Sequence, residues 1–367
     1  MKNRNLVYIV NVDWFFISHR LPLAEEAIKR GFNVFIVCKD TGKFNKLRDI
    51  GAIPINLNFK RSGYNFFNDF ITIIKLFIIL KKIKPQIVHT VTLKVSIIAA
   101  LIHKLYPNYR AVYAISGLGF IFTSGGKFLH FISKIIINFS FNNKKDNFIF
   151  QNFDDLNVFK MSNNNCHLIK GSGIDLNKFH QTPLPKSQST IFIMVSRILK
   201  DKGVVEFCNA FKLLTNKYKN DVSAVLIGPI DKDNPTSLSK TEITILAERT
   251  KVNWLGETSD IFQNIAKSHV AVLPSYREGL PKFLIEASAI GRPLITTNTV
   301  GCKDCVIEGF NGILVPVKNV DKLFEAMEFL HLNHLLRIKM GNNSRFLAME
   351  QYNINHVINT TFEIYTS

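Results

Sequence analysis

Two carboxylates eight residues apart, Glu278 and Glu286, occur in the stretch "SYREGLPKFLIEASAIGRPLI". Pro281 suits the first turn of a helix and Gly291 suits its end, so the stretch predicts a loop followed by a helix containing Glu286. That helix has almost no polar face, and an ionised Glu286 within it needs a partner to offset its lost hydration. A ligand is one such partner, and Lys282, four residues earlier, is the alternative.

A second group of residues has the chemistry to bind an anion. Arg197 ends the apolar run "TIFIMVSR", and Lys202 and Gly203 precede a helix that is predicted to begin at about Val204. Free N–H groups at a helix start, the helix dipole and two basic side chains together favour a diphosphate. The alternative is that both basic residues are ordinary solvated surface charges.

The loop residues Gly279, Leu280 and Pro281 form a second helix start, which we expect at the same edge of a parallel sheet as the first. Glu278 repels an anion, so hydroxyl groups of a sugar are its expected partners, although an ordinary loop charge is the alternative. Glu286 can accept hydrogen bonds from a pair of ribose hydroxyls. Together the two helix starts, the basic pair and the two carboxylates predict a nucleotide-sugar site.

Strands and helices alternate along the chain. Short β-branched runs ("NLVYIVNV", "NVFIVC", "QIVHTVT", "RAVYAISG", "NFIFQN") alternate with helical patterns up to residue 152. In the second half the alternation resumes with six more runs, "TIFIMVSR", "SAVLIG", "VNWLG", "HVAVLPS", "PLITT" and "GILVP". The stretch "HLIKGSGIDLNKFHQTPLPKSQST" between them, with its glycines and prolines, is predicted to be a linker. The pattern therefore predicts an α/β protein with two doubly wound domains, residues 1–180 and 181–349, facing each other across a cleft.

The positive charge is unevenly distributed. Of the net charge of +18, residues 1–180 contribute +15 and residues 181–367 contribute +3. The first half also holds 21 of the 31 phenylalanines. A half that is both basic and apolar favours an anionic membrane surface or an acidic ligand over nucleic acid as its partner.

The composition also predicts a cytoplasmic location. No apolar run reaches the roughly 18 residues of a membrane span, and Asp13 interrupts what would be the apolar core of a signal peptide. The five cysteines are odd in number, which agrees with reduced thiols. Cys302 and Cys305 form a C-x-x-C pair, but a zinc site needs a second pair, which the sequence lacks.

Six sequence blocks, in order, resemble one enzyme family. They are "VDWFFISHRLPLAEEAIKRGFNV", "YAISGLGFIF", "SRILKDKG", "IGP", "SYREGLPKFLIEASAIGRPLI" and "GCKDCVIEGFNGILVP". Together they look like the retaining glycosyltransferases of family 4, which share the GT-B fold, and the likeness covers essentially the whole chain. The first two blocks are typical of bacterial members that build surface polysaccharides or glycan precursors on a polyprenyl carrier.

The resemblance assigns roles in the second domain residue by residue. It implies that Arg197 and Lys202, with Gly203, bind the donor diphosphate and that Glu286 binds the ribose. It also implies that Glu278 is the catalytic residue that contacts the transferred sugar. The following residues, Gly279, Leu280 and Pro281, would contact the sugar and its distal phosphate.

The first domain departs from the family pattern at one position. Many members have a histidine in the loop that reads "AISGLGF" here, and Ser116 stands near that position. The candidate acceptor or sugar contacts in this domain are Asp13, His19, Ser116 and Gly117. His19 is expected in a loop after the first strand, although a packing residue is the alternative there.

The resemblance implies a hexosyltransferase that moves a hexose or N-acetylhexosamine from a UDP-sugar to a polyprenyl-diphosphate-linked saccharide with retention. It implies no metal and no cofactor, since helix starts and basic side chains neutralise the leaving diphosphate. A nucleotide-sugar epimerase of the same fold and a non-enzymatic nucleic-acid or membrane binder are the alternatives. No nucleic-acid-binding module is present, so nucleic acid is not an expected partner.

Two further expectations concern the first domain. The final helix, residues 350–367, is expected to pack back on it, as in other members of the family. The segment "GGKFLHFISKIIINFSFNNKK" is predicted to be an amphipathic helix that lies on the inner face of the cell membrane. A core helix with solvated ends is the alternative for that segment.

Overall fold

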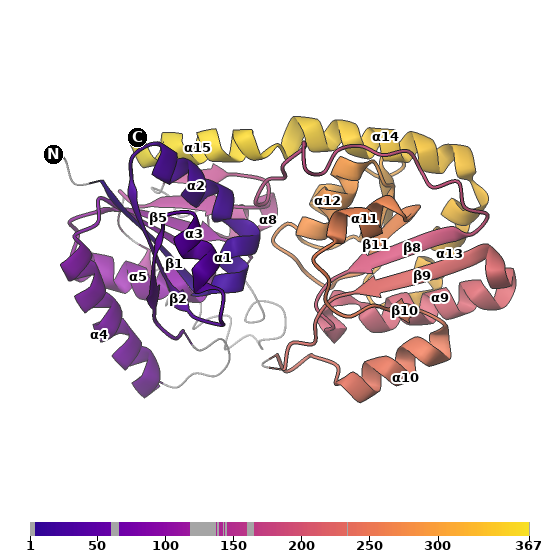
Figure 1. The fold of residues 1–367 in the computed structure, drawn as a ribbon, viewed down its shortest axis with the longest axis horizontal. Helices are drawn as coiled ribbons and strands as arrows, with labels where there is room; N and C mark the ends of the chain where they lie inside the picture. The colour runs from indigo at the N-terminus through magenta and orange to yellow at the C-terminus, as the bar shows by residue number, and fades with distance from the viewer. Residues whose placement is uncertain are drawn as a thin grey trace. The chain divides into compact units, whose positions relative to one another are not determined.

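The computed structural model describes residues 4–59, 66–117, 137, 139–141, 143, 145–159, 165–232 and 234–366. The chain forms two compact units (Figure 1). Unit 1 comprises Met1–Ser172 and Asn355–Ser367, and unit 2 comprises Gly173–Ile354. The chain passes from unit 1 to unit 2 within the stretch predicted to be a linker, and it returns to unit 1 for its last helix.

Unit 1 is built on a parallel sheet with the strand order β3-β2-β1-β4-β5-β6-β7. Its strands are β1 (Asn5–Val12), β2 (Asn33–Lys39), β3 (Ile53–Asn56), β4 (Ile87–Val91), β5 (Arg110–Ile115), β6 (Asn147–Phe150) and β7 (Asn165–Leu168). The five apolar runs quoted above form β1, β2, β4, β5 and β6, whereas β3 and β7 were not predicted. The order reverses between β1 and β4, which is where doubly wound sheets bind ligands.

The helices of unit 1 cover this sheet. They are α1 (Asp13–His19), α2 (Leu21–Lys29), α3 (Phe44–Asp49), α4 (Phe66–Ile83), α5 (Leu93–Leu105), α8 (Phe153–Phe159) and α15 (Ile354–Thr366). Helix α1 was not predicted, because Asp13 at its start and the short run behind it show no clear helical period. In the described part of the chain, no helix is both long enough and apolar enough to cross a membrane.

The C-terminal helix α15 is bonded to the sheet of unit 1. The hydroxyl of Tyr365 lies 2.6 Å from Nδ1 of the buried His89 on β4, and the Arg110 guanidinium on β5 donates to the Tyr365 carbonyl at 2.7 Å. The Arg30 guanidinium lies 4.1 Å from the centre of the Phe362 ring. These contacts make residues from the end of the chain part of the first unit.

Unit 2 also has a parallel sheet, with the order β10-β9-β8-β11-β12-β13. Its strands are β8 (Thr190–Val195), β9 (Val222–Ile227), β10 (Asn253–Trp254), β11 (Val270–Leu273), β12 (Leu294–Thr297) and β13 (Gly312–Val315). All six correspond to apolar runs that sequence periodicity marks as strands. The order reverses between β8 and β11.

The helices of unit 2 follow the strands in the alternating order. They are α9 (Val204–Tyr218), α10 (Lys240–Thr250), α11 (Ile261–Ala266), α12 (Lys282–Ile290), α13 (Val320–Leu332) and α14 (His334–Gln351), with short 3-10 turns at Lys200–Lys202, Lys219–Asp221 and Lys303–Cys305. Gly291 ends α12 with a positive φ of 88°, the conformation that favours glycine at a helix end.

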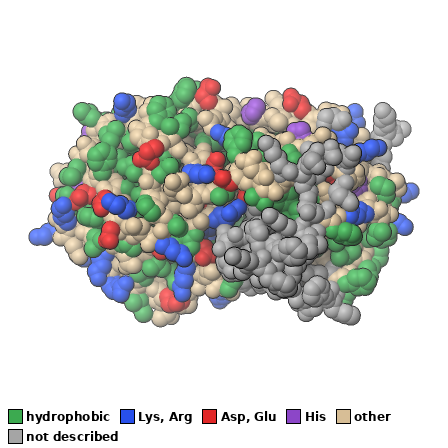
Figure 2. Space-filling model, turned by 180° about the vertical axis from the view of Figure 1, so that it is seen from behind, with side chains coloured by type: hydrophobic (Ala, Val, Ile, Leu, Met, Phe, Trp, Pro, Cys, Tyr) green, Lys and Arg blue, Asp and Glu red, His purple; other side chains and the backbone are tan. Residues whose placement is uncertain are grey.

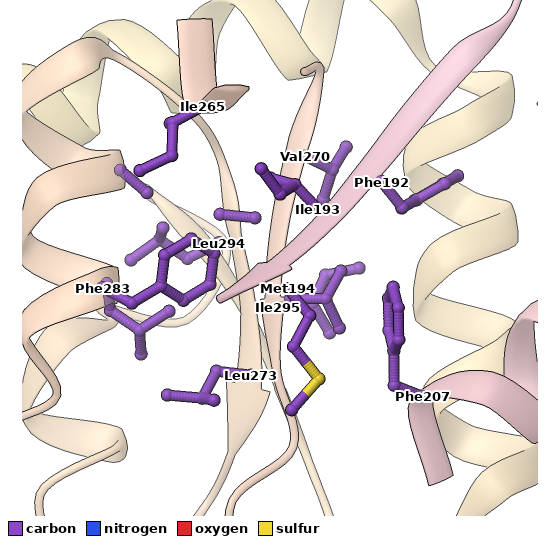
Figure 3. Close-up of a cluster of buried hydrophobic side chains, with 14 of the residues drawn as sticks. Phe192, Ile193, Met194, Phe207, Ile265, Val270, Leu273, Phe283, Leu294 and Ile295 are labelled. Carbon is purple, nitrogen blue, oxygen red and sulfur yellow. The ribbon is translucent and has the colours of Figure 1, made fainter. Parts of the chain in front are cut away.

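The core of unit 2 lies on both faces of its sheet (Figure 3). Phe283 of α12 packs near Leu294 on one side, and Phe207 of α9 lies near Phe192 on the other. These side chains are buried, which explains why the strands read as continuous apolar runs. The two covering helices therefore hold their amino ends in fixed positions beside the strand ends.

Candidate functional site

The predicted donor residues gather at the carboxyl edge of the unit 2 sheet. Arg197 follows β8 by two residues, and Glu278 lies in the loop between β11 and α12. Strands β8 and β11 are hydrogen-bonded neighbours at the point where the strand order reverses. This is the position at which open α/β sheets bind their ligands, so the topology brings the two halves of the predicted site to one place.

Arg197 is held by a carboxylate that sequence reasoning missed. Its Nη1 donates to Oδ2 of Asp231 at 2.5 Å, and the Arg197 side chain remains one-third exposed. Asp231 follows β9, the neighbour of β8, by four residues. The sequence feature that could have identified Asp231 is its position just after "IGP", which ends a second strand at the same edge of the sheet. Asp231 orients the guanidinium while leaving part of it accessible.

Lys202 and Glu278 form an ion pair, with Nζ of Lys202 donating to Oε1 of Glu278. Both side chains are mostly buried, at 19% and 14% exposure. Sequence reasoning brought both residues to the site but gave Glu278 only hydroxyl partners. In the structure Lys202, beside the start of α9, and Glu278, in the loop before α12, neutralise each other's charge.

Backbone hydrogen bonds hold the Glu278 loop beside Lys202. The Tyr276 N–H donates to the Asp201 carbonyl at 2.9 Å, and the Glu278 N–H donates to the Val300 carbonyl at 3.0 Å. The Tyr276 hydroxyl lies 2.6 Å from Oε1 of Glu206, on the first turn of α9. The loop is therefore tied to the start of α9 on one side and to the segment after β12 on the other.

Two glycines permit this close packing. Gly203, at the start of α9, has a φ of 75°, and a Cβ on it would lie 2.1 Å from the Pro274 carbonyl oxygen. Gly301 has a φ of 80°, and a Cβ there would lie 2.3 Å from the Glu278 carbonyl oxygen. Only glycine fits at either position, because any side chain would push a strand-end loop away from its neighbour.

The second helix start lies in the same loop as Glu278. Pro281 is the residue before α12, which begins at Lys282, so Gly279, Leu280 and Pro281 lead directly into the helix. Pro281 itself has an extended backbone conformation. It therefore lies one residue before the first turn of α12, in which the sequence predicted it. The start of α12 therefore follows β11, as the start of α9 follows β8.

Glu286 is buried in the second turn of α12, with Lys282 as its ion-pair partner. Nζ of Lys282 lies 3.4 Å from Oε1 of Glu286, whose side chain is 9% exposed. Burial raises the pKa of Glu286, and the charges of Lys282 and, more weakly, Lys178 oppose that shift. The sequence left open whether a ligand or Lys282 is the partner of Glu286, and the structure shows the ion pair with Lys282.

Asp13 lies at the carboxyl end of β1 in unit 1, and its carboxylate is fully engaged. It is completely buried and accepts hydrogen bonds from the Thr41 N–H at 2.7 Å, the Thr41 hydroxyl at 2.5 Å and the Lys43 N–H at 3.1 Å. Burial raises the pKa of Asp13, but these hydrogen bonds outweigh it and leave the pKa lowered. Asp13 thus holds the loop after β2 against the start of α1.

His19 is the last residue of α1, so its predicted location in a loop was wrong. Its Nδ1 lies 3.1 Å from the Phe15 carbonyl oxygen, and its ring stacks on the Phe15 ring at 4.2 Å between centres. Ser116 and Gly117 directly follow β5 and are half-buried. Asp13, Ser116 and Gly117 therefore follow strands at the carboxyl edge of the unit 1 sheet, whereas His19 packs against its own helix.

The described residues contain no group of three or more His, Cys, Asp or Glu side chains placed to hold a metal ion. Cys302 and Cys305 are both buried thiols, close to the segment after β12. Burial raises the pKa of Cys302 to about 11, with Glu278 contributing in the same direction. Cys302 is therefore a protonated core residue at neutral pH.

Comparison with known proteins relates both units to glycosyltransferases. Residues 176–346 match the family model of group 1 glycosyl transferases, and residues 5–152 match that of glycosyl transferase 4-like proteins. A Campylobacter jejuni N,N'-diacetylbacillosaminyl-diphospho-undecaprenol alpha-1,3-N-acetylgalactosaminyltransferase is 26% identical, covering 95% of this chain and 97% of its own. A Staphylococcus aureus capsular polysaccharide biosynthesis glycosyltransferase is 28% identical, covering 94% and 92%.

Among solved structures, Anabaena HepE in complex with UDP superimposes with a TM-score of 0.77 at 15% identity, covering 99% of each chain. That likeness concerns the fold. The two family models together account for most of both units and include Arg197, Lys202, Glu278 and Glu286. The chain therefore belongs to the family 4 glycosyltransferases and has their GT-B fold of two Rossmann-like domains.

Proposed function

We propose that this glycosyltransferase moves a hexose or N-acetylhexosamine from a UDP-sugar to a saccharide linked to polyprenyl diphosphate, in the synthesis of a surface polysaccharide or glycan. The observation that carries the proposal is the placement of Arg197 and of the Lys202–Glu278 ion pair at the strand-order reversal of unit 2, beside two helix starts. Such a site suits a ligand with both a diphosphate and sugar hydroxyls.

The donor makes three kinds of contact in this proposal. Its diphosphate lies at Arg197, Lys202 and Gly203, its ribose hydroxyls donate to Glu286, and its transferred sugar donates to Glu278. The loop Gly279, Leu280 and Pro281 carries the distal phosphate. Lys202 then binds diphosphate oxygens while it keeps its ion pair with Glu278. Glu286 likewise accepts hydrogen bonds from the ribose hydroxyls while it keeps its ion pair with Lys282. Each carboxylate thereby gains hydroxyl donors without losing its cation.

The reaction itself is a substitution at the anomeric carbon. The bond between the anomeric carbon and the diphosphate oxygen breaks, and the acceptor oxygen bonds to the same face of that carbon, which preserves its configuration. A phosphate oxygen of the leaving UDP takes the acceptor proton. Arg197, Lys202 and the helix starts stabilise the negative charge that develops on the diphosphate. Their contribution makes a metal ion unnecessary in this proposal.

The proposed acceptor is based on the described activities of two relatives. The Campylobacter relative is described as acting on a diphospho-undecaprenol-linked sugar, and the Staphylococcus relative as acting in capsular polysaccharide synthesis. Both cover more than nine-tenths of this chain, so they match unit 1 as well as unit 2. Asp13, His19, Ser116 and Gly117 belong to unit 1, where the proposed acceptor binds.

An acceptor with a lipid tail requires the enzyme to reach a membrane, and helix α4 has a surface suited to one. Its exposed residues are Phe70, Ile71, Ile74, Lys75, Ile78, Lys81 and Lys82. At 100° per residue they share one face, which combines large apolar side chains with three positive charges. The segment at residues 125–145 that the sequence analysis singled out lies mostly outside the described residues.

This α4 face supports docking of unit 1 on the cytoplasmic side of an anionic membrane. Apolar side chains enter the interface while the lysines contact lipid phosphates. On the surface that Figure 2 displays, hydrophobic side chains also lie among Lys and Arg side chains. Sedimentation with vesicles tests this part of the proposal. Changing Lys75, Lys81 and Lys82 to Glu should abolish the preference for anionic vesicles.

A matched control changes Lys240, Lys267 and Lys339, three exposed residues of unit 2, to Glu. It alters the net charge equally, so membrane docking through α4 predicts that it binds like the wild type. Equal binding to neutral and anionic vesicles, or equal loss in both triple variants, would contradict docking through this face.

The catalytic proposal is tested by incubating the purified protein with a panel of UDP- and GDP-sugars and a polyprenyl-diphosphate-linked acceptor. Mass spectrometry of the lipid should show one added hexose or N-acetylhexosamine, and NMR of the product should show the donor's anomeric configuration. The same product should form in excess EDTA. Conversion of a UDP-sugar without any acceptor would instead indicate an epimerase, and an inverted product would refute retention.

A further inference from the structure

A cavity lies in unit 2 at the opposite edge of the sheet from the predicted donor residues. It has a volume of about 680 Å³, within the range of small-molecule sites. One wall is the segment 181–187, another is the first half of α14, and His269 and Gly291 lie just before β11 and β12. The four-residue strand β11 separates this edge from the donor edge by roughly 10 Å.

The lining of this amino-edge cavity is positively charged. Lys186, His334 and Arg337 line it, and none of the described lining residues is an Asp or a Glu. Lys186 and His334 are exposed, so they can reach a ligand without rearrangement of the fold. A cavity with charges of one sign attracts a small ligand of the opposite sign.

Among the residues that the structure describes, no carboxylate pairs with the guanidinium groups of Arg337 and Arg292 at this edge. Arg337 is only 6% exposed, and its Nη1 donates to the carbonyls of Leu330 at 2.5 Å and His331 at 2.6 Å. Its Nε is buried without a hydrogen-bond partner. Arg292 is completely buried, and its guanidinium donates to backbone carbonyls and to the Thr182 hydroxyl. Buried positive charge without a counter-ion is costly, and an anion in the cavity would offset it.

His269 lies at the same edge, and both of its ring nitrogens are occupied by backbone groups. It is buried, its Nδ1 accepts from the Ile191 N–H at 3.0 Å, and its Nε2 donates to the Pro185 carbonyl at 3.1 Å. Burial lowers the pKa of His269 to about 4, against the effect of the Pro185 bond, and the charges of Arg337, Arg292 and His334 lower it further. His269 is thus neutral, and the charges that act on it at this edge are cationic.

We propose that the amino-edge cavity binds a phosphate-bearing small molecule at a site separate from the donor site. Lys186, His334 and Arg337 face the phosphate, and the apolar side chains of Leu184 and Ile338, which also line the cavity, suit the rest of the ligand. Because α14 and the segment 181–187 both contribute, bound ligand would tie these two parts of unit 2 together. Gln181 and Asn342 already join them by a hydrogen bond of 2.9 Å.

Calorimetric titration with inorganic pyrophosphate, in the presence of saturating UDP, tests this proposal because UDP occupies the donor diphosphate site. The wild type should still bind one pyrophosphate. Changing Lys186 and His334 together to Gln should weaken that binding by roughly tenfold or more, since the charge-assisted contact of Lys186 and the imidazole contact of His334 are both lost. Both residues are exposed, so the double variant should fold normally.

The matched control is Lys339→Gln, which removes a positive charge from an exposed position on α14 outside the cavity lining. It should bind pyrophosphate as the wild type does. No binding in the presence of UDP, or the same affinity in the double variant and the wild type, would overturn the proposal. Sugar transfer is not measured, so the result stands whichever donor or acceptor the enzyme uses.

Discussion

Nζ of Lys202 and the carboxylate of Glu278 form an ion pair although 76 residues separate them in the sequence. One residue precedes α9 and the other precedes α12, so the pair connects the two helix starts that follow the adjacent strands β8 and β11. A diphosphate that binds Lys202 must share it with Glu278. The pair therefore couples the site proposed for the phosphate to the site proposed for the sugar.

Arg197→Ala should weaken UDP binding by about 2 kcal/mol, because a charge-assisted hydrogen bond to the diphosphate is lost. Lys202→Ala should weaken UDP binding at least as much, because the same change also leaves the Glu278 carboxylate without its cation and free to repel the phosphate. Isothermal titration calorimetry with UDP measures both. Lys240→Ala, at an exposed position on α10, is the control. Wild-type affinity in both site variants would refute the assignment of the diphosphate.

Glu278→Gln should lower sugar transfer at least tenfold while leaving UDP binding unchanged or slightly tighter, because a neutral amide no longer repels the diphosphate. Glu286→Ala should instead weaken the binding of UDP itself, because the ribose loses its acceptor. Comparing transfer rates with UDP affinities separates the two roles. The division of roles fails if both variants lose the same affinity for UDP.

Gly203→Ala should destabilise unit 2 by more than about 2 kcal/mol, since a positive φ costs roughly 1 kcal/mol and the new Cβ would also overlap the Pro274 carbonyl. Gly309→Ala is the matched control, with a φ of 72° and nothing within 4 Å of the Cβ. Urea unfolding followed by Trp254 fluorescence in a Trp14→Phe background reports on unit 2. Equal shifts of the two midpoints would show that the approach to Pro274 is unimportant.

His269 should make unit 2 less stable in acid. Its pKa is lowered to about 4 in the folded protein, so the unfolded chain, with an ordinary pKa near 6.5, binds the proton more readily. The contribution of neutral His269 to the free energy of unfolding is complete above pH 6.5 and is lost as the pH falls toward 4. At pH 5 the loss is about 2 kcal/mol. The same fluorescence-detected unfolding at pH 7.5 and pH 5 measures it.

Burial also lowers the pKa values of His89, His167 and His331, so the informative quantity is a difference between variants. His269→Gln keeps a side chain that can hydrogen-bond but does not titrate, and it should lose less stability between pH 7.5 and 5 than the wild type. An identical loss in both proteins would assign the acid sensitivity to other residues.

Local sequence patterns were sufficient to predict most of the helices and strands and the residue types at the candidate donor site. Apolar runs between turn residues predicted the six strands of unit 2, and Gly291 predicted the end of α12, because burial and backbone conformation act over a few neighbouring residues. Short elements with mixed composition, such as α1 and β3, were missed for the same reason. Their conformation depends on contacts with distant parts of the chain.

Which charged groups meet was decided by the tertiary structure. The sequence placed Arg197, Lys202 and Glu278 at strand ends, but the partners Asp231 for Arg197 and Glu278 for Lys202 depend on the order of strands in the sheet. The amino-edge cavity likewise requires segment 181–187 and α14, about 150 residues apart, to lie side by side. Ion pairs and cavities form between chain segments that only the folded sheet brings together, so no local pattern encodes them.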